Sequence, residues 1–489
     1  MEKAVRKREE VPNKNTRKRK PMKHKCLFKT VSIFMIVTSL LLIFNFIKIG
    51  VFGIKYISIF TVGLILIEAF LLFVMNKRFK VVIKIPFLIV SIFISGACLF
   101  GVYNLNLAAN FVQKIVSAGL QEERYEIYIL KESSYTSLDD LNKANLGYFN
   151  NESDTLEEAL MLLKKKVTFK NETSYDDLKK MLDDCINAKT DAIFLSSSLI
   201  ELLNEEYEET FFQFKKLSDI TVSSRETTKK SNKNVTKDPF LLYVSGIDTY
   251  GSIGTVSRSD VNILIAVNPK TSKVLLVNTP RDYYVKLHSK KAMDKLTHAG
   301  IYGIEESMNT LGDLYASNVD YYLKINFSSL IKIVDSLGGI TVDSKYEFSY
   351  DGFTFKKGEN NLNGKAALAF SRFRKGLPLG DVSRGENQEA VIEGIIEKMT
   401  SPSIITKYAN ILKTMEDAFV TNMDEKDIYA FAKFQLNKSP KWIIEKQNAY
   451  GRDSYETTYS AGKTKLYVML PQEESVTEVK NKLNDILEG

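Results

Sequence analysis

The sequence predicts an α/β protein that begins with three transmembrane helices, continues with a small α/β accessory domain and ends with a layered α/β domain around a central mixed sheet. The chain has 489 residues, enough for roughly three units at about 150 residues each. Three long apolar runs lie near its N-terminus, and beyond them short apolar runs alternate with amphipathic segments. Hydrophobic residues at 44% and charged residues at 26% fit a folded protein and argue against an intrinsically disordered chain.

The three N-terminal runs predict membrane-spanning helices within residues 31–104. Residues 31–47 and 85–103 carry no charge, and residues 56–75 carry only Glu68. Each run approaches the length of a helix that crosses a bilayer. A cleaved signal peptide has a single apolar region, so the second and third runs exclude that alternative.

Glu68 is a carboxyl group inside an apolar run, which makes it a functional candidate. The alternatives are a proton relay or helix partner, and a neutral side chain hydrogen-bonded to a neighbouring helix. The second alternative is favoured, because a bare charge in the bilayer is costly.

The net charge of +8 is concentrated at the N-terminus. Residues 1–30 form a basic tail with twelve Lys and Arg against three acidic residues, a net charge of +9. Residues 31–104 contribute +5, which leaves −6 for the rest of the chain. A nucleic-acid-binding protein needs its cationic surface on a folded domain, so nucleic acid is not expected as a partner.

The positive charges near the spans predict the orientation of the chain. Lys and Arg in short loops favour the cytoplasmic side, and the tail and residues 77–84 are the two basic stretches. Two spans separate them, so both lie inside and the third span leads outward. The sequence therefore predicts a multi-pass protein of the cell membrane with a cytoplasmic N-terminus and extracellular C-terminal domains.

The accessory domain is predicted at residues 120–221. Residues 125–130 alternate as in a strand, residues 156–163 place leucines on one helical face, and residues 191–195 form a second strand before a helix through Leu199. Residues 222–238 are dominated by Ser, Thr, Lys and Asn and predict a linker.

The last domain is predicted at residues 239–489. Its expected strands are the apolar runs at residues 240–244, 261–267, 274–277 and 321–325, and residues 327–337 form an expected helix. Buried strands interleaved with helices predict layers with the sheet in the middle.

Charged residues stand at the ends of these apolar strands. Asp248 follows the first strand, Arg258 and Asp260 precede the second, and Arg281 and Asp282 end the third. Ordinary surface ion pairs and turn or helix caps are the alternative to a functional site. Five such positions at strand ends nevertheless indicate a site.

A second group of polar residues lies further along the chain. In an extended segment, Arg372 and Arg374 would point to one face. Arg384 and Gln388 are four residues apart and share a helical face, with Asp381 three residues before Arg384.

Carboxylates and arginines together suit a magnesium ion and a polyphosphate. Mg²⁺ takes carboxylate and phosphate oxygens, and the guanidinium fork matches phosphate bidentately. Gly246, Gly251 and Gly254 fit neither the Walker pattern nor the dinucleotide fingerprint. Three scattered cysteines and three histidines exclude a disulfide framework and make an imidazole-based metal centre improbable.

These segments, taken in order, resemble the LytR-CpsA-Psr family from about Phe240 to the C-terminus. Its CpsA-type branch also has several spans and an accessory domain. The segments that carry the resemblance are residues 246–251, 258–262, 280–285 and 295–299, and residues 371–374 through Gln388.

The resemblance implies a phosphotransferase that moves a capsular or other anionic cell-wall polysaccharide from an undecaprenyl pyrophosphate carrier onto peptidoglycan. Asp248 and Asp260 would hold Mg²⁺, with Mn²⁺ as the alternative. Asp381, as an orienting group or base, would act with Arg372 and Arg374 as the catalytic residues. The implied pyrophosphate-binding residues are Arg258, Arg281, Lys295, Arg372, Arg374, Arg384 and Gln388.

The sequence departs from the family pattern at Thr297, where Asn is frequent, and at Ile304, where a second Gly is frequent. We interpret His298 as a structural histidine rather than a general base. Expected partners are the lipid-linked glycan, peptidoglycan, the membrane and proteins of capsule or cell-wall synthesis. The alternative function is a membrane-bound regulator that senses lipid-linked precursors without turnover.

Overall fold

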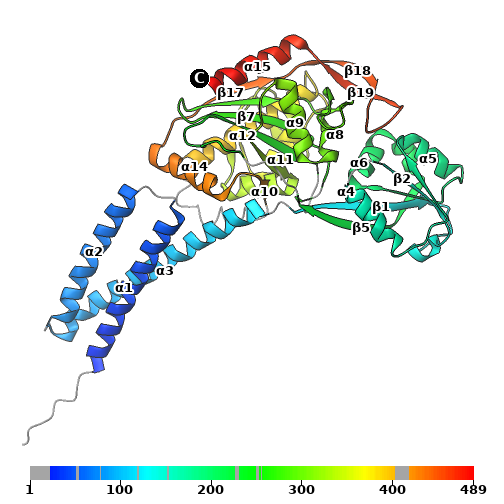
Figure 1. Cartoon of the computed structure of the whole chain (residues 1–489). Helices are drawn as coiled ribbons and strands as arrows, with labels where there is room; N and C mark the ends of the chain where they lie inside the picture. The colour runs from blue at the N-terminus through cyan, green and yellow to red at the C-terminus, as the bar shows by residue number, and fades with distance from the viewer. Residues whose placement is uncertain are drawn as a thin grey trace, which may run out of the picture. The chain divides into compact units, whose positions relative to one another are not determined.

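The structure is a computed structural model, shown in Figure 1, and it divides into two compact units, Met1–Leu105 and Asn106–Gly489. The predicted basic tail up to residue 22, Arg78 of the basic loop, residues 226–230 of the linker and residues 249–251 of the first motif lie outside the described residues. The described residues are 23–50, 54–77, 79–117, 120–150, 154–225, 231–248, 253–254, 256–401 and 418–489.

The first unit contains the three apolar helices that the sequence predicts. The helices are α1 (Lys23–Ile49), α2 (Ile54–Asn76) and α3 (Val81–Ser117), the last of which continues into the second unit. Each contains a stretch long and apolar enough to cross a membrane: Cys26–Ile49, Ile54–Asn76 and Val81–Leu107.

Glu68 on α2 is buried and has a partner on the neighbouring helix. The Ser39 hydroxyl on α1 donates a hydrogen bond to Glu68 Oε1, and Cys98 Sγ on α3 lies 3.5 Å from the same hydroxyl. The predicted hydrogen bond between Glu68 and a neighbouring helix is therefore confirmed.

The second unit begins with the accessory domain, a five-stranded sheet in the order β3-β2-β4-β1-β5. Alternate residues of β4 face two separate cores: Ala192 and Phe194 pack in the core beneath α4, and Ile193 and Leu195 pack with α5 and α6. The strands are β1 (Leu120–Leu130), β2 (Asn145–Phe149), β3 (Asn171–Tyr175), β4 (Ala192–Ser196) and β5 (Phe214–Arg225). The helices are η1 (Leu138–Leu141), α4 (Asp154–Lys164), α5 (Leu178–Ile186), α6 (Ser197–Glu206) and α7 (Glu208–Phe211).

Strand β5 extends into the segment that the sequence assigns to the linker. It pairs antiparallel with β1 as far as Leu120 opposite Arg225. Because β1 is eleven residues long, its backbone pairs with the polar residues at the end of β5, although these residues show no apolar alternation. The strand therefore ends four residues beyond the expected boundary at residue 221.

The larger domain is built on a six-stranded mixed sheet in the order β16-β11-β6-β7-β8-β17. Strands β11 and β6 run parallel, as do β8 and β17, whereas β6, β7 and β8 are antiparallel. The predicted mixed sheet is thus confirmed. The strands are β6 (Phe240–Ile247), β7 (Val261–Asn268), β8 (Lys273–Asn278), β11 (Tyr321–Asn326), β16 (Val420–Thr421) and β17 (Ile443–Asn448).

Helices cover both faces of this sheet, as the continuous apolar strands predict. Leu241 and Tyr243 of β6 pack with α9 (Ile304–Tyr315) and α15 (Glu473–Glu488). Phe240 and Val244, which point the other way, pack with α12 (Asp381–Thr400) and α14 (Glu425–Lys438). The layered architecture is visible in Figure 1.

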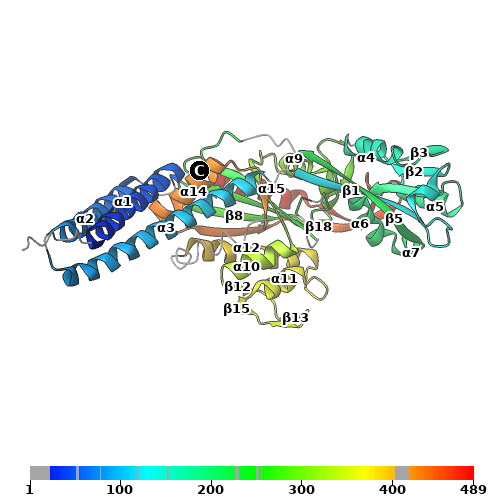
Figure 2. The same cartoon turned by 90° about the horizontal axis from the view of Figure 1, so that it is seen from below.

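A group of helices and short hairpins lies beside the sheet (Figure 2). Asn326 and Asn363 start its two helices, because their side chains accept hydrogen bonds from the amides of Ser329 and Ala366, each at 2.9 Å. These helices are α10 (Phe327–Ser336) and α11 (Gly364–Arg372), and the hairpins are β12 (Ile340–Ser344) with β15 (Gly358–Leu362) and β13 (Phe348–Tyr350) with β14 (Phe353–Phe355). The remaining elements are β9 (Tyr284–Lys286), β10 (Met293–Lys295), α8 (Leu296–Ala299), η2 (Gly300–Tyr302), β18 (Gly451–Thr457) and β19 (Lys465–Pro471).

Candidate active site

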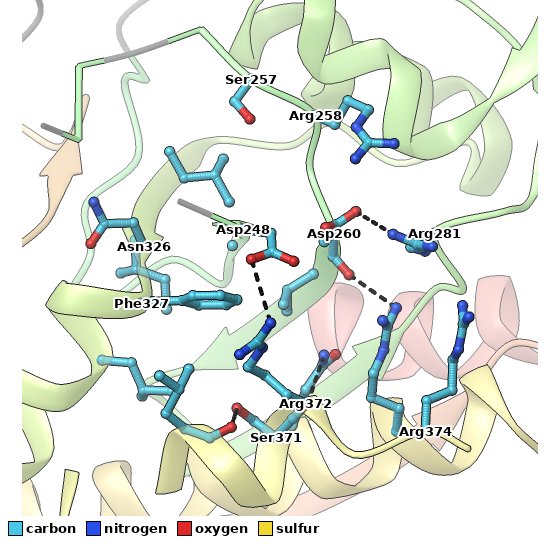
Figure 3. Close-up of a pocket in the computed structure, with 18 of the residues that line it drawn as sticks. Asp248, Ser257, Arg258, Asp260, Arg281, Asn326, Phe327, Ser371, Arg372 and Arg374 are labelled. Carbon is cyan, nitrogen blue, oxygen red and sulfur yellow. Dashed lines mark hydrogen bonds and ion pairs between the residues drawn. The ribbon is translucent and has the colours of Figure 1, made fainter. Parts of the chain in front are cut away.

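A cavity of about 780 Å³ lies where β6 ends and β7 begins, and most of the predicted site residues line it (Figure 3). Lys295 and Asp381 are not part of its lining among the residues that the structure describes. The predicted residues that do line it are Asp248, Arg258, Asp260, Arg281, Arg372, Arg374, Arg384 and Gln388.

The two aspartates reach the cavity from neighbouring antiparallel strands. Asp248 follows β6, and the amide of Asp260 donates to the carbonyl oxygen of Gly246 at 2.8 Å. A Cβ on Gly246 would lie 2.7 Å from Cβ of Val261, so the close approach of the two strands needs glycine at this position. The strand pairing therefore places both carboxylates at the same end of the two strands, where β6 ends and β7 begins.

The two carboxylates have different electrostatic surroundings. Asp260 accepts hydrogen bonds from Arg281 Nη1 at 2.9 Å and from the Thr297 hydroxyl at 3.2 Å. Burial opposes its ionisation, but the charges of Arg281 and Arg258 outweigh burial and lower its pKa. Asp248 is half exposed, 4.0 Å from Arg372 Nη2, and burial followed by the charge of Asp260 raises its pKa.

Arg372 is the last residue of a helix and Arg374 lies two residues beyond it, which corrects the expectation that both belong to one extended segment. Helix α11 runs to Arg372, because Asn363 caps it and the intervening Ala and Leu residues favour a helix. The guanidinium carbon of Arg372 lies 4.4 Å from the ring centroid of Phe327, a cation–π contact. Both arginines still line the cavity.

Helix α12 supplies the last group of predicted residues. The expected contact three residues apart is present, with Asp381 Oδ1 2.6 Å from Arg384 Nη2. Gln388 Nε2 donates to the carbonyl oxygen of Ser371 at 3.3 Å, which joins α12 to the end of α11. Asp381 therefore faces Arg384, while Arg384 and Gln388 face the cavity.

Lys295 and His298 are buried in polar contacts outside the cavity lining. Lys295 Nζ lies 2.6 Å from Glu206 and 3.6 Å from Asp282. Nδ1 of His298 lies 2.6 Å from Asp294, and the His298 side chain is fully buried. These contacts agree with the interpretation of His298 as a structural residue.

Three glutamates of the accessory domain that the sequence pattern does not indicate also meet this site: Glu201, Glu205 and Glu206. Glu201 and Glu205 line the cavity, and Glu206 pairs with Lys295. In the sequence they belong to an amphipathic helix of ordinary composition. No local signal distinguishes them, because their partners are more than fifty residues away.

Arginines and paired aspartates of an α/β domain line one cavity, an arrangement that suits the binding of a polyanion. Residues 210–485, more than half of the chain, match the LytR_cpsA_psr family. The chain therefore belongs to this family. The match does not specify a branch, so the CpsA-type branch remains a prediction.

Curated relatives carry the name polyisoprenyl-teichoic acid–peptidoglycan teichoic acid transferase TagU. The protein of Bacillus subtilis (strain 168) is 42% identical over 204 residues, which cover 41% of this chain and 66% of that protein. The protein of Enterococcus faecalis (strain ATCC 700802 / V583) is 36% identical over 226 residues, 45% of this chain and 74% of the relative. A crystal structure of B. subtilis TagU is 34% identical and covers 52% of this chain and 98% of its own, with a TM-score of 0.41.

Proposed function

We propose that the protein transfers an anionic glycan from a polyprenyl pyrophosphate carrier to peptidoglycan, leaving a phosphodiester link. The observation that carries the proposal is one cavity that combines five lining arginines with two aspartates and an apolar wall. Family membership and relatives that are named as transferases from polyisoprenyl carriers to peptidoglycan support it. The proposed glycan is a capsular or other anionic cell-wall polysaccharide.

The lining of the cavity suits both ends of such a donor. Arg372, Arg374 and Arg384 offer charged donors for a pyrophosphate. Ile325, Phe327, Leu330 and Leu368 line the same space and would contact the first part of an isoprenoid chain. The cavity volume of about 780 Å³ is in the range of small-molecule sites.

The proposed reaction is a displacement at phosphorus. An acceptor hydroxyl of peptidoglycan attacks the phosphorus that bears the sugar and releases its proton. The bond to the bridging oxygen breaks, and polyprenyl phosphate leaves. Arginines that line the cavity would neutralise the charge that grows on the leaving phosphate, and Asp381 would orient Arg384.

The two aspartates fit a hard divalent cation. Asp248 and Asp260 line one cavity with like charges, and Mg²⁺ often takes one or two carboxylates while keeping waters and substrate phosphates as its other ligands. The described residues contain no group of three or more His, Cys, Asp or Glu that could hold a metal ion. Two aspartates would therefore bind the cation only together with the phosphates of the substrate. Asp248 and Asp260 would hold Mg²⁺, or Mn²⁺ in its place, and the bound ion would neutralise phosphate oxygens.

We place the catalytic domain outside the membrane, with the basic tail in the cytoplasm, on the distribution of Lys and Arg around the three candidate spans. An outer compartment lacks nucleoside triphosphates. A transferase there needs a donor that is already activated in the membrane, and a polyprenyl pyrophosphate is such a donor.

Transfer by the purified full-length protein tests the proposal, with a synthetic polyprenyl-pyrophosphate glycan as donor and peptidoglycan as acceptor. Arg372→Ala should lower kcat by about 100-fold or more, as removal of a donor to a developing charge does. Arg452→Ala is the matched control, because Arg452 is an exposed residue of β18. Undiminished transfer by Arg372→Ala would refute the site, and loss of cellular function only on deletion of residues 1–25 would favour the regulator.

A further inference from the structure

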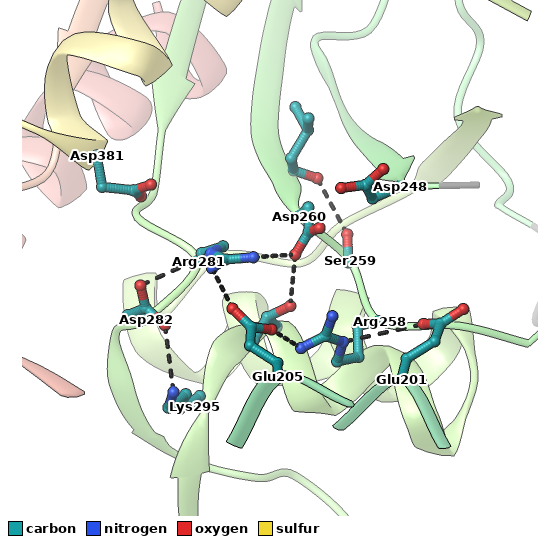
Figure 4. A network of polar contacts seen from close by, with 12 residues as sticks. Glu201, Glu205, Asp248, Arg258, Ser259, Asp260, Arg281, Asp282, Lys295 and Asp381 are labelled. Atoms are coloured by element: carbon teal, nitrogen blue, oxygen red, sulfur yellow. Dashed lines mark hydrogen bonds and ion pairs between the residues drawn. The ribbon is translucent and has the colours of Figure 1, made fainter. Parts of the chain in front are cut away.

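Helix α6 of the accessory domain meets the cations of the site, although it lies outside residues 210–485, the part of the chain that matches the family. Glu201 and Glu205 are four residues apart and therefore share one face of the helix. Figure 4 shows both carboxylates directed toward the guanidinium of Arg258. The chain thus brings an acidic face to the arginines from a second domain.

Glu205 bridges two of the arginines that line the cavity. Its Oε1 accepts a hydrogen bond from Arg281 Nη2 at 2.7 Å, and its Oε2 accepts one from Arg258 Nη1. The side chains of Arg258 and Arg281 are only 12% and 11% exposed. Burial opposes ionisation of Glu205, but the two arginines outweigh it and lower its pKa to about 2, so the bridge is charged at neutral pH.

The position of α6 is fixed by contacts on both sides of Glu205. The Ser257 hydroxyl donates to Glu201 Oε2 at 2.8 Å, and Lys295 Nζ lies 2.6 Å from Glu206 Oε1. Behind these ion pairs, leucines of α6 share a buried cluster with Ile301 and Leu466 of the larger domain. The carboxylate of Glu205 is therefore held in place by both polar and apolar packing.

The contacts of Glu205 favour a role in orienting Arg258 and Arg281 over competition with a phosphate for these arginines. Glu205 contacts one nitrogen of Arg258 and one nitrogen of Arg281, and a second nitrogen of Arg281 donates to Asp260. A guanidinium carries five N–H donors, so N–H groups remain on both side chains. Each arginine can thus donate to Glu205 and to a phosphate at the same time. Without the carboxylate, two neighbouring guanidiniums of like charge would repel each other and separate.

We propose that Glu205 is a positioning residue of the transfer site, so that the accessory domain completes the pair of arginines that binds the donor's phosphates. The inference rests on the proposed function. It gives the accessory domain a part in donor binding through Arg258 and Arg281.

The test measures binding of farnesyl pyrophosphate to the full-length protein by calorimetry, together with the transfer assay above. Glu205→Gln keeps the size of the side chain and removes its charge, and it should weaken binding and lower kcat by about tenfold or more, because small misplacements of binding groups are costly. Glu205→Asp keeps the charge and should restore part of both. Glu209→Gln, an exposed residue of the neighbouring α7, is the matched control and should behave as wild type.

Four outcomes separate the two levels of inference. Weaker binding by Glu205→Gln at an unchanged melting temperature, with partial rescue by Glu205→Asp, supports the positioning role. Tighter binding by Glu205→Gln would overturn it, because the carboxylate would then compete with the phosphate. Wild-type binding by Glu205→Gln, with weak binding by Arg258→Ala, would overturn this inference and leave the proposed function standing. Wild-type binding and transfer by both Arg258→Ala and Arg281→Ala would overturn the phosphate site itself.

Discussion

Glu389 on α12 makes the stability of the helix that carries Arg384 and Gln388 dependent on pH. Its side chain is 1% exposed and lines a second cavity of about 160 Å³. Asn448 Nδ2 donates a hydrogen bond to its Oε2 at 3.3 Å. Burial raises the pKa of Glu389 from 4.5 to about 8, and the charge of Lys446 offsets only part of that effect.

The sign and size of the effect follow from this shift. A carboxyl group with a raised pKa in the folded state favours folding fully below about pH 4.5, and this contribution is lost as the pH rises through about 8. At about 1.4 kcal/mol per pH unit, the free energy of unfolding falls by about 4–5 kcal/mol across that interval. Glu389→Gln cannot ionise, so we expect it to be more stable than wild type by about 4 kcal/mol at pH 8 and nearly equal to it near pH 4.5.

Urea unfolding of the full-length protein in a nonionic detergent measures this difference. Trp442 is the single tryptophan of the chain and packs against Phe431 and Phe434, with ring centroids 6.0 and 6.4 Å away, so its fluorescence reports the larger domain. Glu397→Gln, an exposed residue of the same helix, is the control and should show no comparable pH dependence. If wild type and Glu389→Gln lose stability in parallel between pH 5 and pH 8, the reasoning is refuted.

Three further predictions concern packing and the metal. Gly385→Ala places a Cβ 1.8 Å from Asn278 Nδ2 and should lower the free energy of unfolding by about 2 kcal/mol. The double variant with Asn278→Ala should regain part of this stability. An unchanged urea midpoint for Gly385→Ala would contradict the close packing. His298→Ala removes the buried partner of Asp294 and should cost about 2–4 kcal/mol in urea unfolding; the fraction that stays folded should keep its kcat, and a large loss of kcat there would speak for a general base. Removal of divalent cations with EDTA should abolish transfer and Mg²⁺ or Mn²⁺ should restore it; persistent transfer in EDTA argues against the roles of Asp248 and Asp260.

The central sheet could be predicted from the sequence because its strands are continuously apolar. Strands β6, β7 and β8 are buried on both faces, so nearly every residue reports burial. The hairpins β12–β15 and β13–β14 could not be found in this way. Strands of three to five residues with mixed polarity have no measurable period, and their pairing depends on the cluster that Phe348 and Phe355 form with α11.

The site was partly predictable for a related reason. Asp248, Asp260 and Arg281 stand out because charge at the end of an apolar strand is unusual. Arg372 lines the same cavity as the two aspartates, but its backbone is helical rather than extended, since alternation over four residues does not separate a strand from a helix end. Glu205 carries no such local mark, and only the docking of two domains reveals its partners.

The hydrogen bond between Ser39 and Glu68 has a consequence for how the chain enters the membrane. A charged side chain at the centre of a bilayer costs about 2.5–3.5 kcal/mol on translocon-insertion scales, and α2 carries its carboxyl group in the middle of a candidate span. Helix α1 is synthesised before α2, so the Ser39 hydroxyl is available as a hydrogen-bond donor to Glu68 when α2 leaves the insertion machinery. The order of synthesis therefore suits insertion of the two helices as a pair.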